Sequence, residues 1–380
     1  MNVLITGANG FVGRNLAATL ENIRTGKDQV HQLEEEIELL LYTREDGVEK
    51  LREYLAAADF IFHFAESDRE EDEEAFMEAN YDPAVQMLDM LEELDNPCPI
   101  VYLSSDHAIR NSPFGHCKKQ VENLLREYGQ RVYAPILIYR LQGMFGKWGK
   151  IEYNSVTATF CHHIARGLPI MINKRTTQIT IFYIDDVVEE MLRALDGCET
   201  WKGDFCVVKP KYVVELGELV DQLYSFRTSR ENHQVPDLLD DFTRKPYATY
   251  LSYLPEDDFS DELKPNVDER GSFTEILRTE HHGQFSVNIS KPGVAKGQHW
   301  HHTKSEKFLV VSGKGVIRFR QLHSDKVIEY YVSGDKLEVV DIPTGYTHNI
   351  ENLVDTDLIT FMWATECFDP ERPDTFALEV

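Results

Sequence analysis

The stretch 293–313 constrains the fold of this chain most, because it spaces potential metal ligands as one face of a strand would. His299 and His301 are two residues apart, and side chains of a strand alternate between its faces, so both imidazoles lie on one face. Glu306 follows past a turn, and a Pro and Gly turn further on precedes His348. Three imidazoles and one carboxylate suit zinc or another first-row divalent metal. The pattern predicts a metal site, with ordinary strand histidines as the alternative.

A second motif stands at the start of the chain. Residues 2–6 form an apolar run, followed by closely spaced glycines and a helical stretch. A buried strand, a glycine turn and a helix open a dinucleotide-binding unit, in which the glycines let the backbone approach a pyrophosphate at the helix N-terminus. A plain strand-to-helix turn is the alternative. We expect the cofactor to be bound by this turn, at Gly7, Gly10, Phe11, Val12 and Gly13.

The second predicted strand, residues 38–42, bears on which dinucleotide is bound. It ends without the Asp or Glu that would hold a ribose 2'-hydroxyl, and Arg44 follows instead. An arginine in this place favours NADPH, because it accommodates the 2'-phosphate. A surface arginine without a ligand is the alternative.

The order of predicted elements indicates two domains. Apolar runs at 59–65, 100–106, 136–140 and 180–187 alternate with helical stretches, which predicts a parallel sheet covered on both faces. A link rich in Pro and charged residues, 254–266, precedes strand-rich sequence. At 380 residues, two domains are expected. We predict an α/β Rossmann-type domain over residues 1–254 and an all-β domain over residues 255–380.

Charge and cysteine content limit the partners and the compartment. The chain has 39 Lys and Arg against 65 Asp and Glu, a formal charge of -26 that repels nucleic acid and anionic membranes. Its six cysteines are dispersed and form no C-x-x-C pair, which is typical of reduced thiols. No apolar run approaches the ~20 residues of a membrane span. We expect a cytoplasmic protein that binds neither nucleic acid nor a membrane.

The two metal-ligand segments resemble the two motifs of the cupin family, small β-barrels of the jelly-roll type. The first motif fits at every fixed position, and the second fits over residues 343–352. The N-terminal half resembles the extended short-chain dehydrogenases/reductases that rebuild nucleotide sugars. The two halves together, with residues 266–275 and 286–293, resemble the bifunctional enzymes of UDP-N-acetyl-L-fucosamine synthesis, which make capsular polysaccharide precursors.

This resemblance implies a reaction sequence. The cupin domain would invert C3 of a UDP-2-acetamido-2,6-dideoxy-4-hexulose, and the Rossmann domain would reduce C4 with NADPH. The C3 proton lies beside the C4 carbonyl, so a base can remove it and return it from the other face. The base stays open among a histidine, a lysine and a tyrosine near the metal, with Lys304 and Tyr346 as candidates. The resemblance also implies that Asn154 contacts the UDP-sugar, and we expect a homo-oligomer.

The reductase half departs from its family at the proton donor. The family places a tyrosine four residues before a lysine; Lys118 holds the lysine position, but Phe114 holds that of the tyrosine. The preceding strand ends in Ser105 and Asp106, so a carboxylate stands where the family has a hydroxyl. Without a general acid, the rate falls roughly 100-fold to 10,000-fold. Ser105, Asp106 and Lys118 are the remaining catalytic candidates.

Four interpretations stay open. The chain is a bifunctional epimerase and reductase, or a metal epimerase whose Rossmann domain only binds nucleotide. Alternatively it is a non-enzymatic dinucleotide sensor or scaffold. A fourth possibility is an iron cupin that activates oxygen, because three histidines and one glutamate also suit iron.

Overall fold

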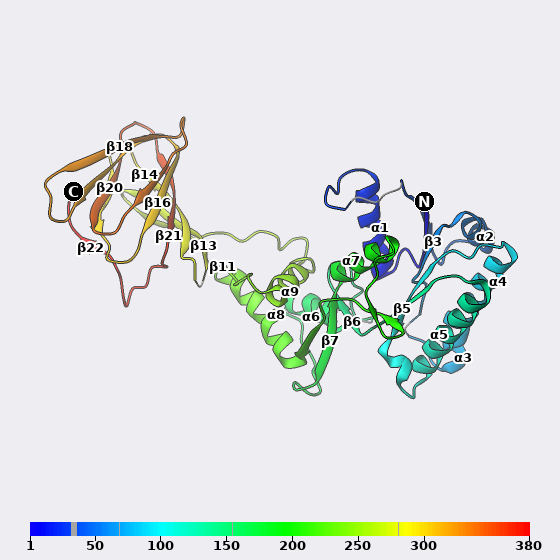
Figure 1. Cartoon of the computed structure of the whole chain (residues 1–380). Helices are drawn as coiled ribbons and strands as arrows, with labels where there is room; N and C mark the ends of the chain where they lie inside the picture. The colour runs from blue at the N-terminus through cyan, green and yellow to red at the C-terminus, as the bar shows by residue number, and fades with distance from the viewer. Residues whose placement is uncertain (32–35, 68, 154, 280) are drawn as a thin grey trace. The chain divides into compact units, whose positions relative to one another are not determined.

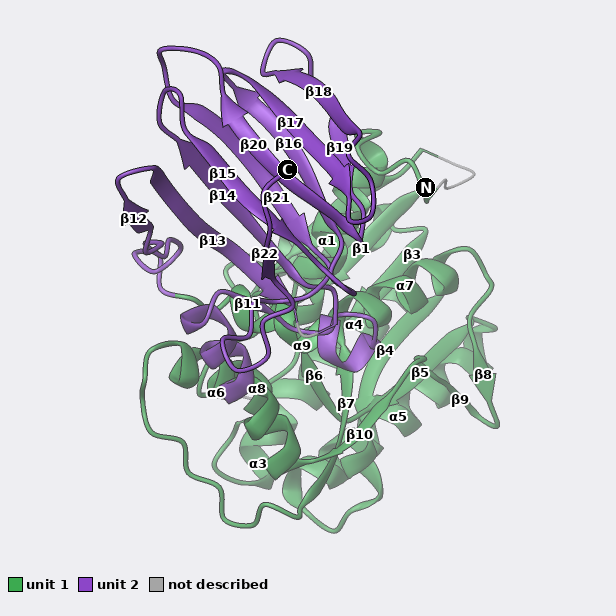
Figure 2. Ribbon diagram, turned by 90° about the vertical axis from the view of Figure 1, so that its left-hand side faces the viewer, with its two compact units in different colours: residues 1–223, 245–254 green, residues 224–244, 255–380 purple. Residues whose placement is uncertain are grey.

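The computed structural model describes residues 1–31, 36–67, 69–153, 155–279 and 281–380 (Figure 1). The chain divides into two compact units, coloured separately in Figure 2. Unit 1 comprises Met1–Leu223 and Lys245–Leu254, and unit 2 comprises Tyr224–Arg244 and Pro255–Val380. The segment 224–244 therefore groups with the strand-rich part of the chain that follows residue 254.

Unit 1 is built on a seven-stranded sheet that is buried on both faces. Along its first strand, Val3 and Ile5 belong to one apolar core and Leu4 belongs to another. Because strand side chains alternate, each core occupies one face of the sheet. The strand order is β2 (Glu38–Tyr42), β1 (Asn2–Thr6), β3 (Phe60–His63), β4 (Ile100–Ser105), β5 (Ile136–Leu141), β9 (Phe205–Cys206) and β8 (Trp201–Lys202).

Helices cover both faces of this sheet. The core on one face takes its helical side chains from α1 (Phe11–Arg24) and α7 (Ile184–Leu195). The core on the other face takes them from α2 (Val48–Ala57), α4 (Asp82–Glu93) and α5 (Pro113–Val132). All strands from β2 to β9 pair in parallel, and β8 is antiparallel. The predicted Rossmann-type α/β fold is confirmed.

The order of the strands indicates where a ligand would bind. β1 lies between β2 and β3. The chain therefore passes from β1 to β2 on one side and then crosses to β3 on the other side, so the direction of the strand order reverses at β1. In open α/β sheets, ligands bind beyond the carboxyl ends of the strands at such a reversal. The glycine turn that begins at Gly7 follows β1 and lies at this point.

One predicted strand is wrong in its second half. The apolar run predicts an extended segment over residues 180–187, but β7 (Gln178–Tyr183) ends at Tyr183 and α7 begins at Ile184. Asp185 and Asp186 stand in the first turn of α7, where the helix dipole favours acidic side chains. The apolar residues of the first helical turn continue the apolar run of the strand, which hides the boundary in the sequence.

The remaining elements of unit 1 and the junction are a small sheet and further helices. A three-stranded sheet has the order β10 (Tyr212–Glu215), β7 and β6 (Gly143–Phe145). The other helices are α3 (Glu73–Phe76), η1 (Met77–Tyr81), η2 (Asp106–Ile109), α6 (Val156–Ala165), α8 (Leu216–Glu231) and α9 (Asp241–Leu251). The first boundary between the units falls inside α8.

Unit 2 contains two sheets with mainly antiparallel pairing. One has the order β11 (Gln234–Val235), β13 (Gly271–Thr279), β14 (Gln284–Ser290), β21 (Leu358–Ala364), β16 (Glu306–Ser312) and β19 (Val339–Ile342), with β12 (Asn266–Asp268) paired to β13. The other has the order β18 (Val327–Ser333), β17 (Lys314–Gln321), β20 (Tyr346–Asn352), β15 (Ala295–Trp300) and β22 (Phe376–Ala377).

The two sheets of unit 2 pack face to face. Their shared core draws Phe308 and Leu358 from the first sheet and Ile317, Phe319 and Ile350 from the second. This arrangement is that of a jelly-roll barrel, and the predicted all-β fold after the α/β domain is confirmed. We refer to these two sheets as the barrel.

The described residues contain no helix that is long and apolar enough to cross a membrane. All six cysteines are free thiols, and four of them are buried.

Candidate functional site

A β-bulge in β15 sets the position of the first predicted metal ligand. Gly297 pairs with Asn349 of β20, and His299 pairs with His348, so Gln298 is the extra residue. Gly297 and Gln298 have φ angles of +105° and +62°. A Cβ at Gly297 would lie 2.8 Å from the backbone oxygen of His348, so this position requires glycine. The bulge places His299 directly opposite His348 on the neighbouring strand.

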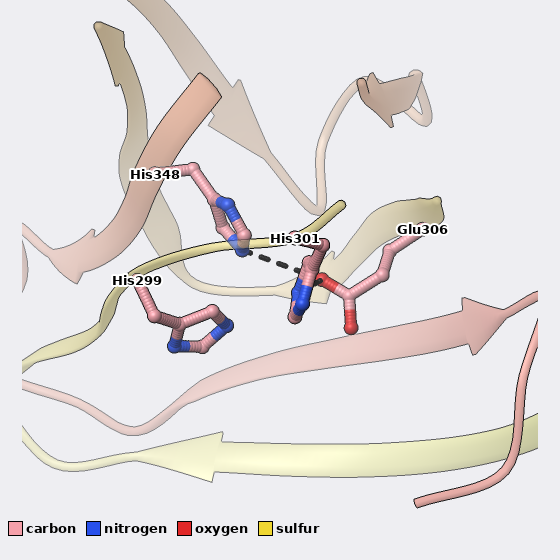
Figure 3. A group of neighbouring side chains, drawn as sticks. All are labelled: His299, His301, Glu306 and His348. Carbon is pink, nitrogen blue, oxygen red and sulfur yellow. Dashed lines mark ion pairs between the residues drawn. The ribbon is translucent and has the colours of Figure 1, made fainter. Parts of the chain in front are cut away.

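The four predicted ligands converge in the barrel. His299, His301, Glu306 and His348 each offer one ligand atom, and these atoms all lie within 4.8 Å of one another. Glu306 Oε2 is 3.3 Å from His348 Nε2 and 3.5 Å from His301 Nε2. Figure 3 shows the three imidazoles and the carboxylate pointing toward a common space. The residues come from β15, from the residue just beyond it, from the start of β16 and from β20.

Several atoms of this cluster are buried without a hydrogen-bond partner. They are His301 Nε2, Glu306 Oε2 and both ring nitrogens of His348. His301 and His348 are only 2% and 1% exposed. A buried polar atom left without a partner costs about 1–3 kcal/mol, so four of them in one place are destabilising unless a ligand satisfies them. Nitrogen donors and one carboxylate are the donor set of zinc and related first-row ions, and the residues fit such a metal.

The protonation states of the cluster also suit a cation. Burial raises the pKa of the Glu306 carboxyl, but the nearby imidazoles of His301 and His348 outweigh it, so the pKa lies well below its usual range. Burial, followed by the neighbouring His348 and His301, lowers the pKa of His299 to about 4. At neutral pH the cluster therefore presents an ionised carboxylate and a neutral His299, the forms that bind metals.

The structure shows the surroundings of the two candidates for the general base, Lys304 and Tyr346. Lys304 is 8% exposed, and its ammonium donates a hydrogen bond of 3.2 Å to Thr375 Oγ1. Tyr346 packs against the barrel core. Sequence reasoning missed Asp374, whose carbonyl oxygen accepts a hydrogen bond from His301 Nδ1. No local pattern marks Asp374, because it reaches the site only through the pairing of β22 with β15.

The glycine turn of unit 1 is closely packed. Gly7 has a φ of +67°, and a Cβ there would lie 2.6 Å from the backbone oxygen of Phe64. A Cβ at Gly13 would lie 2.4 Å from the Gly7 oxygen. Gly10 caps α1 without a side-chain hydrogen bond, which leaves the N–H groups of the first turn available to an anion. The turn thus combines a tight backbone path with N–H groups open to an anion, and the binding of a dinucleotide pyrophosphate there stays a prediction.

Phe11 and Val12 belong to this turn through their backbone. Val12 is 6% exposed in the core between α1 and the sheet, and Phe11 packs against the same core. Their side chains therefore support the helix, while their N–H groups lie in its first turn. Any contact they make with a dinucleotide would come from those N–H groups.

Lys118 is held by groups of the protein itself. Its side chain is 4% exposed, its ammonium donates to the Leu103 carbonyl at 2.9 Å, and it forms an ion pair with Glu66. The ammonium also lies 5.6 Å from the centre of the Phe114 ring and 5.0 Å from that of Tyr102. Lys118 thus faces a phenyl ring, which has no hydroxyl to activate.

Ser105 and Asp106 also make interactions within the chain. Ser105 Oγ caps η2 by accepting a 3.2 Å hydrogen bond from the His107 N–H. Asp106 Oδ2 accepts a 2.7 Å hydrogen bond from Gln142 and lies 3.5 Å from Arg110. Asp106 Oδ1 is buried without a hydrogen-bond partner. Of the three candidate catalytic residues, Asp106 therefore has the most capacity for a further interaction.

Two further residues, Arg44 and Asn154, are predicted to contact the cofactor and the sugar. Arg44 lies in the turn between β2 and α2, one residue after Thr43, whose N–H donates to Asp46 at 2.7 Å. Asn154 lies outside the described residues. Its neighbour Ser155 caps α6 by accepting a 3.2 Å hydrogen bond from the Ala158 N–H.

Comparison with known proteins gives matches along the whole chain. Residues 3–207 match the NAD dependent epimerase/dehydratase family, and residues 266–376 match the polysaccharide biosynthesis C-terminal domain. The structure is similar to the capsular polysaccharide assembling protein CapF from Staphylococcus aureus, with a TM-score of 0.91 and 50% identity over 100% of both chains.

Two curated proteins are also similar. A UDP-2-acetamido-2,6-beta-L-arabino-hexul-4-ose reductase from Pseudomonas aeruginosa is 40% identical over 380 residues, covering 100% of this chain and 99% of that protein. The spore coat polysaccharide biosynthesis protein SpsL from Bacillus subtilis is 30% identical over 122 residues, covering 30% of this chain and 81% of SpsL. The chain belongs to the NAD dependent epimerase/dehydratase family and, along its whole length, to the CapF-like nucleotide-sugar enzymes of capsular polysaccharide precursor synthesis.

Proposed function

We propose that the chain is a UDP-sugar 3-epimerase whose reaction takes place at the barrel cluster, with UDP-2-acetamido-2,6-dideoxy-4-hexulose as substrate. The observation that carries this proposal is the convergence of His299, His301, Glu306 and His348, whose ligand atoms lie within 4.8 Å of one another. The name of the Pseudomonas aeruginosa relative supports the substrate class, because it is a reductase of a UDP-linked 4-hexulose.

The chemistry of the substrate explains why such a cluster is useful. Removing the C3 proton leaves negative charge that is shared with the C4 oxygen, and returning a proton from the opposite face inverts C3. A bound divalent metal would stabilise charge on an oxygen of the substrate. Three neutral imidazoles and one carboxylate leave such an ion one net positive charge. The cluster would therefore attract the anionic form of the substrate more strongly than its neutral form.

The residues around the cluster supply the proton transfers in this proposal. Lys304 and Tyr346 stay the candidates for the general base. A divalent metal held by His299, His301, Glu306 and His348 would supply stabilisation of negative charge on the substrate, and the proton transfers would be left to the protein side chains. His299 and Glu306 are the partly buried members of the cluster, whereas His301 and His348 are almost fully buried.

A second candidate activity, reduction of C4 with NADPH, is favoured by the tight glycine turn before α1. A cofactor bound there would deliver a hydride to C4, and a proton must reach the C4 oxygen. Phe114 has no proton to give, and Lys118 is paired with Glu66. Asp106 is paired with Arg110 as a carboxylate and has no proton to give, but its unpartnered Oδ1 can accept a hydrogen bond from a water molecule that supplies the proton, and the Ser105 hydroxyl is the other candidate donor. We propose that unit 1 binds NADPH, with Arg44 near the 2'-phosphate and Asn154 near the UDP-sugar, and reduces C4 slowly.

Product analysis by NMR tests both activities. The 4-keto sugar is incubated in deuterated water with zinc, with and without NADPH. Deuterium at C3 and inversion there are expected in both samples, whereas a C4 alcohol and cofactor oxidation are expected only with NADPH and at a low rate. No deuterium at C3 would exclude the epimerase and favour a non-enzymatic sensor or scaffold. Oxygen uptake by the iron-loaded protein would instead favour an oxygen-activating cupin.

We further propose that the protein works in the cytoplasm as a homo-oligomer. The free thiols of all six cysteines and the formal charge of -26 support a reducing compartment without nucleic-acid or membrane partners. Light scattering of the purified chain would measure the oligomeric state. A monomer at micromolar concentration would contradict the proposed homo-oligomer.

A further inference from the structure

The last seven residues, 374–380, form a segment that we call the C-terminal strap. Within it, β22 pairs with β15, with Ala377 opposite His299 and Phe376 opposite Trp300. Further along, the Leu378 N–H donates to the backbone oxygen of Gln298 at 3.0 Å. The strap therefore lies along the strand and the bulge that position the first predicted metal ligand, although most of its residues are exposed.

The carboxylate of Asp374, the first residue of the strap, holds the loop between two predicted ligands. Its oxygens accept hydrogen bonds from the backbone N–H groups of His302, Thr303 and Lys304, at 2.9, 2.8 and 2.9 Å. The hydroxyl of Thr303 adds a fourth, at 3.1 Å. One carboxylate thus satisfies three consecutive N–H groups between His301 and Glu306. Hydrogen bonds to an ionised acceptor are roughly twice as strong as neutral ones.

The backbone carbonyl of Asp374 acts on His301 itself. It lies within hydrogen-bonding distance of His301 Nδ1. A carbonyl oxygen only accepts, so Nδ1 must carry a proton. In a neutral imidazole the other nitrogen, Nε2, then keeps its lone pair, and this atom is 3.5 Å from Glu306 Oε2 inside the cluster. The contact therefore selects the tautomer in which His301 binds a metal.

We propose that Asp374 is a positioning residue of the metal centre, which fixes the tautomer of His301 through its carbonyl and the path from His301 to Glu306 through its carboxylate. This inference rests on the proposed metal function of the cluster. Outer partners of this kind change metal affinity by about 10- to 100-fold when they are removed. The strap would thus couple the C-terminal end of the chain to the assembly of the site.

The test compares zinc affinity in full-length variants, by competition with a chelating dye. Asp374→Ala removes all four side-chain hydrogen bonds, and about 10- to 100-fold weaker binding is expected. Asp374→Asn keeps one acceptor oxygen but no charge, and an intermediate loss is expected. Glu371→Gln is the matched control, because it removes one charge from an exposed residue of the same region whose carboxylate has no partner among the described residues. Its affinity should equal that of the wild type.

The visible spectrum of the cobalt-loaded protein separates positioning from stability. A residue that only stabilises the barrel would lower its melting temperature without changing the spectrum of the saturated site. A positioning role predicts a shifted or weakened ligand-field band in both Asp374 variants. If Asp374→Ala does not fold, Asp374→Asn alone decides. Wild-type affinity and spectrum in Asp374→Asn would overturn the inference, whereas a wild-type protein that binds neither ion would overturn the metal site itself.

Discussion

The two units hold their candidate catalytic groups in opposite states. In the barrel, His301, Glu306 and His348 have buried atoms without a hydrogen-bond partner. In unit 1, Lys118 is equally buried, but its ammonium is paired with Glu66 and donates to a backbone carbonyl. An added ion would bind the barrel atoms that have no hydrogen-bond partner in the chain. The ammonium of Lys118 already has partners within the chain. The partners of buried polar groups, and not residue identity alone, show which site needs a ligand.

The same comparison separates binding from catalysis within unit 1. The glycine turn keeps the close contacts that a dinucleotide site requires, since a Cβ at Gly7 or Gly13 would collide with backbone atoms. The proton donor is the doubtful part, because Phe114 holds the position that the resemblance to short-chain reductases assigns to a tyrosine. Binding depends on the backbone path, which the fold maintains, whereas proton transfer depends on one hydroxyl group. A single substitution can therefore remove proton transfer and leave dinucleotide binding intact.

Removing a metal ligand should have the largest effect. Glu306→Gln removes the only negative charge among the four ligands, and we expect zinc affinity to fall by more than about 100-fold, since even outer partners are worth about 10- to 100-fold. Deuterium exchange at C3 should fall with it, while NADPH binding to unit 1 should stay unchanged. Metal analysis after dialysis, NMR of the sugar and cofactor titration measure the three quantities.

A matched control for this variant is His281→Gln, which changes an exposed imidazole of the same unit. It should retain both zinc and C3 exchange. If Glu306→Gln bound zinc and exchanged C3 as the wild type does, the barrel cluster would not be the reaction centre.

Restoring the tyrosine should have the next largest effect, in the opposite direction. Phe114→Tyr places a phenol beside Lys118, whose ammonium lies 5.6 Å from the ring centre. We expect NADPH-dependent reduction of C4 to rise by about 100-fold, the low end for a general acid, because Lys118 stays paired with Glu66. The rate of NADPH oxidation with the 4-keto sugar measures it. Phe368→Tyr, at an exposed position of unit 2, should change nothing.

An unchanged rate in Phe114→Tyr would show that the missing hydroxyl is not what limits the reductase. In that case Asp106, which stands where the family has a hydroxyl residue, becomes the group to replace. C3 exchange at the barrel should be the same in all of these variants, because the cluster contains no residue of unit 1.

The fold could be predicted from the sequence because it depends on local periodicity, and the four-residue cluster could be predicted because its segments resemble the two motifs of a known barrel family. The alternation of apolar runs with helical stretches indicated the parallel sheet, and the two-residue spacing of His299 and His301 indicated a shared strand face. The boundary at Ile184 could not be found this way, since the apolar run continues from β7 into α7. A strand and the first turn of a buried helix can have the same composition.

Long-range contacts explain what the sequence did not reveal. The pairing of Asp374 with the loop after His301 spans more than seventy residues, and its signal is a single ordinary aspartate. The ion pair between Glu66 and Lys118 likewise joins the segment after β3 to a helix far along the chain. The bulge at Gln298 is local, but a glutamine gives no sign of a positive φ. Each of these features depends on how the elements pack together.

Acid should produce the smallest effect, and it should act on unit 1 through His63. This residue is 3% exposed and contacts Thr6 Oγ1 at 2.9 Å. Burial, reinforced by the Lys118 ammonium, lowers the pKa of His63 to about 4, from a value of 6.5 without these effects. Between these values the unfolded chain binds a proton that the folded chain does not. The free energy of unfolding therefore has its full value above pH 6.5. It decreases as the pH falls toward 4 and is about 2 kcal/mol lower at pH 5.

Native-state hydrogen exchange of peptides from β1 and β3, corrected for the intrinsic rate at each pH, measures this loss. His63→Gln should flatten the dependence between pH 7 and pH 5, even though it lowers stability at neutral pH through the contact with Thr6. His116→Gln, an exposed histidine of the same unit, should leave the dependence as it is. Zinc should not protect these peptides, because the metal would bind only the barrel. An equal slope in wild type and His63→Gln would place the acid sensitivity of unit 1 at another group.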